Sequence, residues 1–133
     1  KLKEKSLVLI NPDAVVDKKD KEIIDFLIEK DMVVIHARSI QCDHKKLKTL
    51  YPHVILEESI ATMLENFSKG NAIIVVFEGM NAISVGLETK KVFREKYYYG
   101  YYGCTIHASD NEKEFKREIS ILLPDFLTKK QGD

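Results

Sequence analysis

A histidine near the end of the chain, His107, has the residue type and the setting to do chemistry. It follows a short apolar run and precedes a stretch that predicts a helix start, ASDNEKEFKREI. Such a start offers unpaired backbone N–H groups and the positive end of a helix dipole, which together favour phosphate. Histidine can act as a nucleophile toward phosphorus and form a covalent intermediate. His107 is therefore a candidate nucleophile for phosphoryl transfer.

Two other interpretations of His107 stay open from spacing alone. The simpler one is a histidine that packs and hydrogen-bonds at a strand end without doing chemistry. The other is a metal site, since Cys104 lies close before His107, and Cys42 close before His44. Residues three apart on a strand point to opposite faces, so Cys104 and His107 would need a bend to share an ion.

The first half of the chain predicts a strand, a helix, a second strand and two short helices. Residues 6–10 form an apolar run that the turn signal NPD stops, and residues 32–40 are rich in β-branched residues. Between them an apolar stripe at helical spacing ends near Lys30. Asp43 is the predicted N-cap of the next helix, and Gly70 marks the end of the one after it.

The second half alternates strand and helix again. Residues 72–77 predict a central strand covered on both faces, and after a turn at EGMN a helix is expected over residues 81–90. A last strand is expected over residues 101–106, and a capping box of Ser109 and Glu112 predicts the start of the final helix. This order predicts an α/β (α+β) fold, a ferredoxin-like split β-α-β sandwich with a four-stranded antiparallel sheet and helices.

Size and charge fit one globular domain. The chain has 133 residues, of which 44% are hydrophobic, which is enough for one domain with a core of its own. Its 21 Lys and Arg residues balance 21 Asp and Glu residues, so charge gives no general attraction to nucleic acid or to an anionic membrane. Because the sequence starts at Lys1 and ends in a polar segment, we expect one domain of a longer polypeptide.

The expected compartment follows from cysteine content and hydropathy. Two cysteines do not make a disulfide framework, which favours a reducing interior. No apolar run approaches the length needed to span a bilayer. We therefore expect a cytoplasmic protein without a membrane partner, and an axonemal or nuclear location stays open.

Three segments resemble, in order, the motifs of a known family. INPDAVV follows the first strand, FEGMNAI includes the end of the central strand, and TIHASDNEKEFKREI lies near the end of the chain. They are similar to KPDGV, WEGxNxV and NxxHGSDSxExAxxEI of the nucleoside diphosphate kinase family, and the last of these is the specific one. The resemblance covers residues 6–126 and implies the nucleoside diphosphate kinase fold, with residues 1–133 as a single domain of this kind.

This resemblance implies an activity and a set of site residues. Family members move the terminal phosphate of a nucleoside triphosphate to a nucleoside diphosphate by a ping-pong route. His107 would carry the phosphate, with Ser109 and Glu118 in support. Tyr51 and Arg94 would contact the phosphates. Mg²⁺, carried by the nucleotide rather than by a protein metal site, would neutralise the triphosphate.

The chain also departs from the family motifs. The lysine of the first motif is Asn11, an arginine after the second motif is Leu87, and the asparagine before the histidine is Cys104. Asn11 and Cys104 would still occupy phosphate-binding positions. The aromatic residue that stacks on the base appears as Ser59. Part of the loop that joins subunits in the family hexamer is missing, so a monomer or a dimer is expected.

The segment 90–102 bears on whether activity survives these departures. Its cations, Lys90, Lys91, Arg94 and Lys96, could move into the vacated places, or could merely solvate an exposed loop. Its tyrosines could stack on a base, form a β edge or contact a partner. A nucleic-acid platform would also use aromatic and basic residues, but the chain has no net charge.

Two functions follow, from different classes. Phosphoryl transfer depends on positioning and on cations around the phosphates, and one lost electrostatic contact costs on the order of 10² to 10³ in rate. The first hypothesis is therefore a weakened nucleoside diphosphate kinase. The alternative is a catalytically degenerate domain that serves nucleotide binding or assembly with protein partners.

Overall fold

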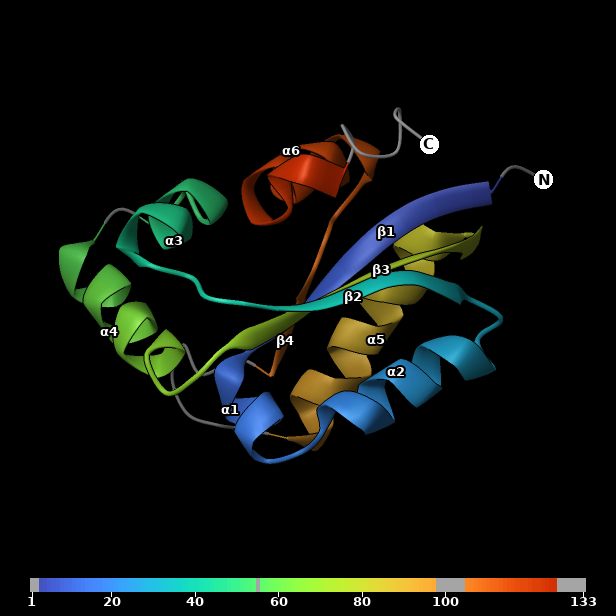
Figure 1. Ribbon diagram of the computed structural model, residues 1–133, viewed down its shortest axis with the longest axis horizontal. Helices are drawn as coiled ribbons and strands as arrows, with labels where there is room; N and C mark the ends of the chain where they lie inside the picture. Colours follow the sequence, from blue (N-terminus) through green and yellow to red (C-terminus); the bar gives the residue numbers. More distant parts are fainter. Residues whose placement is uncertain (1–2, 55, 98–104, 127–133) are drawn as a thin grey trace.

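A four-stranded antiparallel sheet lies at the centre of the computed structural model, which describes residues 3–54, 56–97 and 105–126 (Figure 1). Its strands stand in the order β2-β3-β1-β4. Their bounds are Lys3–Ile10 for β1, Val33–Ile40 for β2, Ala72–Met80 for β3 and Ile106–Ala108 for β4. All neighbouring strands pair antiparallel, which confirms the predicted ferredoxin-like sheet.

Helices cover both faces of this sheet (Figure 1). They are α1 (Pro12–Val16), α2 (Asp20–Glu29), α3 (His44–Leu50), α4 (Glu57–Phe67), α5 (Ala82–Lys96) and α6 (Glu112–Leu122). Helices α2 and α5 pack on one face, and α3, α4 and α6 pack on the other. Among the described residues, no helix combines the length and the apolar character needed to cross a membrane.

The two faces carry separate apolar cores because the side chains of β1 alternate. Leu7 and Leu9 pack with α3, α4 and α6, whereas Val8 and Ile10 pack with α2 and α5. All four side chains are fully buried. Burying one such side chain contributes about 1.5–3 kcal/mol. The central strand β1 therefore anchors both layers and supports the short strand β4 beside it.

Helix α5 is longer than its sequence pattern indicates. It was expected to end near Lys90 but continues to Lys96, because residues 91–96 contain no Gly or Pro and Phe93 is buried in the core. Its N-cap, Asn81, has a φ of 60°, a left-handed conformation that Asn adopts more readily than most residues. The cations of this segment therefore lie on a helix and not in an exposed loop.

Three other boundaries differ from the expectation. The NPD segment opens α1 instead of only turning the chain, with Pro12 in the first turn, where no N–H donor is required. The EGM segment extends β3 to Met80 because the first residues of β1 pair with it. The last strand was expected over residues 101–106 but spans Ile106–Ala108; residues 101–104 lie outside the described part of the chain.

Candidate active site

The short strand β4 holds His107 within the sheet. His107 pairs with Leu9 of β1 and so lies inside the last strand, which was expected to end at residue 106, before the histidine. Its neighbours Ile106 and Ala108 pack in the core under α2 and α5, so strand alternation directs the His107 side chain toward α6. Since β4 is an edge strand, helices from both faces can approach the histidine.

Glu118 of α6 connects His107 to Ser109. The His107 Nε2 atom lies 2.8 Å from Glu118 Oε2, and the Ser109 hydroxyl donates a hydrogen bond of 2.6 Å to Glu118 Oε1. Glu118 is only 3% exposed, so these protein groups replace water as its partners. Among the described residues no hydrogen bond to the Nδ1 atom of His107 is found.

Ser109 does not cap α6. The N-cap is Asn111, whose side chain accepts a hydrogen bond of 2.8 Å from the Glu114 backbone N–H. The predicted capping box of Ser109 with Glu112 is therefore wrong, and the reason is that the Ser109 hydroxyl is engaged by Glu118. The helix begins at Glu112, and Ser109 stays beside the histidine.

Tyr51 packs against His107 from the end of α3. The two ring centroids are 5.4 Å apart at an interplanar angle of 77°, an edge-to-face contact. Arg117 of α6 holds this end of α3, because its Nη1 donates to the Thr49 carbonyl at 2.8 Å and its Nη2 to the Leu50 carbonyl at 3.0 Å. Arg117 was not predicted as a site residue because it falls at an unspecified position of the third motif.

A cavity of about 280 Å³ opens beside His107. Lys90 and Arg94 line it from α5, whereas Tyr51 and Arg117 line it from the opposite face of the sheet. The other polar residues on its walls are His53, Asp110, Glu114 and Glu118. The structure thus places Tyr51 and Arg94 on the walls of the same cavity as His107, and Ser109 is linked to the histidine through the Glu118 carboxylate.

The family model for nucleoside diphosphate kinase matches residues 4–127. The chain belongs to the nucleoside diphosphate kinase family. The nucleoside diphosphate kinase of Methanocaldococcus jannaschii is 27% identical over 132 residues, which cover 92% of this chain and 94% of the relative. Nucleoside diphosphate kinases are phosphotransferases that act on nucleotides, and this chain falls in that class.

Solved structures of the family share the fold. The apo enzyme of Encephalitozoon cuniculi superposes with a TM-score of 0.77 at 23% identity, covering 89% of this chain and 87% of that one. The Borrelia burgdorferi enzyme, described as a transition-state mimic with bound vanadate and ADP, gives a TM-score of 0.74 at 20% identity, covering 90% and 86%. These structures confirm the fold that the three sequence motifs imply.

Three of the four departures from the nucleoside diphosphate kinase motifs lie away from the cavity walls. Asn11 is 4% exposed, and its Oδ1 atom has no hydrogen-bond partner among the described residues. Leu87 packs against the core under α2 and α5, and Ser59 is buried in α4. None of these three side chains lines the cavity. Cys104, the fourth departure, lies outside the described residues.

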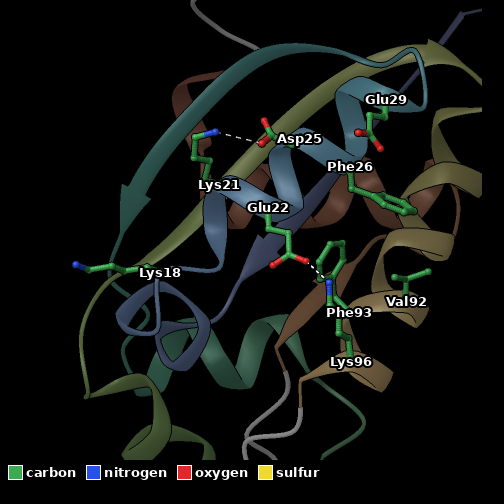
Figure 2. Close-up of a pocket in the computed structure, with 9 residues that line it drawn as sticks. All are labelled: Lys18, Lys21, Glu22, Asp25, Phe26, Glu29, Val92, Phe93 and Lys96. Carbon is green, nitrogen blue, oxygen red and sulfur yellow. Dashed lines mark hydrogen bonds and ion pairs between the residues drawn. The ribbon is translucent and has the colours of Figure 1, made fainter.

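A wider groove of about 620 Å³ lies between α2 and α5, on the face of the sheet that these two helices cover (Figure 2). Lys96 forms an ion pair with Glu22 there, and the Tyr97 hydroxyl donates a hydrogen bond of 2.6 Å to Glu22. The hydrogen bonds from Lys96 and Tyr97 lower the pKa of Glu22. Lys96 is thus engaged away from His107, and the tyrosines at positions 98–102 lie outside the described residues.

Metal binding by the protein itself finds no support in residues 3–54, 56–97 and 105–126, where no group of three or more His, Cys, Asp or Glu side chains could hold an ion. Cys42 is buried as a free thiol, and Cys104 is not among these residues. The cavity wall does present the carboxylate of Asp110, whose side chain is 70% exposed. Oxygen ligands of this kind, together with phosphates, fit Mg²⁺ that arrives with a nucleotide.

Proposed function

We propose that this chain transfers the terminal phosphate of a nucleoside triphosphate to a nucleoside diphosphate through a phosphohistidine at His107, more slowly than a member with the full motif set. One observation carries the proposal. His107 is fixed by Glu118, which Ser109 fixes in turn, and the histidine faces a cavity that contains basic side chains. A histidine that only packed at a strand end would not need a buried carboxylate partner and an adjoining cavity.

The hydrogen bonds around His107 favour Nδ1 as the nucleophile. The Glu118 carboxylate accepts a hydrogen bond from Nε2–H, so Nδ1 carries the lone pair. When Nδ1 attacks the terminal phosphorus, the bond from phosphorus to the bridging oxygen breaks and the nucleoside diphosphate leaves. The imidazole ring gains positive charge, which the carboxylate beside it stabilises. A second nucleoside diphosphate then takes the phosphate and restores the neutral ring.

The charge around the cavity supports a reduced rate. Positive groups around the phosphates are the main source of catalysis in phosphoryl transfer. Arg94 lines the cavity, but the side chains at positions 11 and 87 are an amide and an alkyl group that lie outside its walls. Mg²⁺ bound to the nucleotide would supply further positive charge. Asp110 is the wall residue whose oxygen atoms would meet that ion.

The test is covalent labelling of the purified domain with γ-labelled ATP and Mg²⁺. We expect acid-labile, base-stable label on the protein, and its discharge when a nucleoside diphosphate is added. His107→Ala should abolish the label. His44→Ala is the matched control because His44 is exposed at the start of α3, away from the cavity walls, and should leave it unchanged. A wild-type protein that takes up no label at long times would refute the enzyme proposal.

A second candidate function is nucleotide binding or protein assembly without turnover. It is favoured by the uncharged residues Asn11 and Leu87, which leave the cavity without two of the cations of the family motifs. Thermal-shift titration with Mg-nucleotides separates the possibilities, since a ligand that binds only the folded state raises its melting temperature. Saturable stabilisation without label supports binding, and no stabilisation at millimolar nucleotide supports assembly. For either function we propose a monomer or a dimer, which light scattering would check.

A further inference from the structure

We propose that Lys90 binds the phosphoryl group that His107 receives, and so supplies charge that positions 11 and 87 do not. This inference rests on the function proposed above. Lys90 lies on α5, about one helical turn after Leu87 and one before Arg94, and its side chain, 23% exposed, lines the cavity beside His107. Position 90 lies outside the three segments that resemble the family motifs.

Arg94 and Lys90 lie close to residues on either side of His107 in the sequence. The Arg94 Nε atom donates a hydrogen bond of 2.9 Å to the carbonyl of Ile106, the residue before the histidine. The Lys90 Nζ atom lies 3.9 Å from Asp110 Oδ1, three residues after the histidine. A phosphoryl group on the Nδ1 atom of His107, inside this cavity, would share it with both cations.

Of the cavity cations, Lys90 is the one with the weakest existing partner. Arg117 already donates to two carbonyl groups and to Glu114, the last at 3.0 Å. At 3.9 Å, by contrast, the Lys90 ammonium is beyond hydrogen-bond distance from the exposed carboxylate of Asp110. A pair of this kind contributes little in water. A phosphate, with more negative charge and three acceptor oxygens, would draw the ammonium away from Asp110.

The other lysines of the same helix do not fit this role. Lys91 is exposed, about 100° further around the helix than Lys90, and does not line the cavity. Lys96 is paired with Glu22 in the groove between α2 and α5 (Figure 2). Of the three lysines at positions 90, 91 and 96, which the sequence alone does not distinguish, Lys90 lines the cavity.

The experiment measures the rate of phosphohistidine formation in wild type, Lys90→Ala, Lys90→Arg and Lys91→Ala. We expect Lys90→Ala to label about 10- to 100-fold more slowly, since one well-placed charge near the phosphates is lost. Lys90→Arg should recover most of the rate, and Lys91→Ala should match wild type. A purely structural role for Lys90 predicts no such rescue by charge. Labelling of Lys90→Ala at the wild-type rate, with equal melting temperatures, would overturn the inference.

Binding measurements separate a failure of this inference from a failure of the proposed function. If wild type takes up no label, the proposed function fails, and the dissociation constants for Mg-ATP and Mg-ADP then test Lys90 alone. We expect Lys90→Ala to weaken Mg-ATP about 10-fold or more and Mg-ADP less, because the lysine is assigned to the terminal phosphate. Equal affinities in wild type and Lys90→Ala would overturn the role of Lys90 as a phosphate ligand.

Discussion

The guanidinium group of Arg117 on α6 donates a hydrogen bond of 3.0 Å to the carbonyl of Leu50, 67 residues earlier at the end of α3. Orphan carbonyl groups at a helix C-terminus favour a cation, and Arg117 serves two of them at once. The next residue after this helix end is Tyr51, whose ring packs on His107. Arg117 therefore fixes the wall of the cavity that faces the histidine.

Replacing Arg117 should disturb both stability and phosphorylation. Arg117→Met keeps an aliphatic stem but removes the hydrogen bonds to α3, so we expect a loss of about 1–3 kcal/mol in the free energy of unfolding. Displacement of Tyr51 should also slow labelling of His107, by about 10-fold or more. Lys116→Met, in the exposed neighbour, is the control for both assays. A variant of Arg117 with wild-type labelling would show that Tyr51 does not need this anchor.

Glu118 should determine how well His107 reacts. Glu118→Gln preserves size, but the amide cannot accept hydrogen bonds from His107 and Ser109 with both of its terminal atoms. We expect phosphohistidine formation to fall by about 100-fold or more, as when the orienting carboxylate of a catalytic histidine is neutralised. A time course of labelling, with samples quenched at successive times, measures this rate. Glu112→Gln, at the exposed start of α6, should leave it unchanged, and equal rates for the two variants would contradict the assignment.

Substitutions of Ser109 and Asn111 should affect different properties of the protein. Asn111→Ala removes the N-cap of α6, so we expect about 1 kcal/mol less stability and little change in labelling. Ser109→Ala removes the donor to Glu118, so we expect slower labelling, by about 10-fold. The free energy of unfolding, from chemical denaturation, and the labelling rate should both be measured for each variant. If Ser109→Ala lost stability but kept full activity, its hydroxyl would be merely structural.

A lysine at position 11 should increase the labelling rate. Asn11 directly follows β1 and has a buried side-chain oxygen with no partner among the described residues, and its backbone N–H donates to the Thr105 carbonyl just before β4. Asn11→Lys adds a flexible cation at the position where the family motif has one, and we expect phosphohistidine to form at least about 10-fold faster. Asn11→Met adds similar bulk without charge and should not accelerate labelling. Acceleration by both variants would point to packing as the cause.

Cys42 should react slowly with alkylating reagents. Burial raises the pKa of its thiol to about 11 from an ordinary value of 9.0. At pH 8 the thiolate is therefore about 100-fold scarcer than in an unfolded chain. In a Cys104→Ser background, iodoacetamide labelling should rise about 10-fold per pH unit up to about pH 11, whereas in denaturant it should level off above about pH 9. A folded-state plateau near pH 9 would contradict this shift.

The sequence predicted the sheet and the central residues of the site because their signals are local. The apolar runs of β1 and β3 and the HxSD segment each depend on neighbouring residues. The cap was assigned wrongly for the opposite reason. Ser109 and Asn111 can both cap a helix, and the choice between them depends on Glu118, which lies more than two helical turns further along.

The remaining residues of the site depend on tertiary contacts that no local pattern contains. Arg117 acts on α3 from α6, so only the packing of the two helices reveals it. The sequence alone does not distinguish Lys90 from Lys91. The packing of α5 on β4 places Lys90 on the cavity wall and leaves Lys91 outside it. The length of α5 was underestimated because Phe93 is held by α2, whose aromatic residue Phe26 meets it edge to face at 5.5 Å.

The central position of β1 has a consequence for how the chain folds. Val8 of the first strand pairs with Val75 on one side and with Ala108 on the other, so both of its partners are made long after it. Such distant pairings close large loops and are slow to form. During synthesis both edges of β1 stay unpaired until β3 has been made. The pairing of Leu9 with His107 can form only after β4 has been made. The position of His107 beside β1 is therefore fixed among the last contacts of the growing polypeptide.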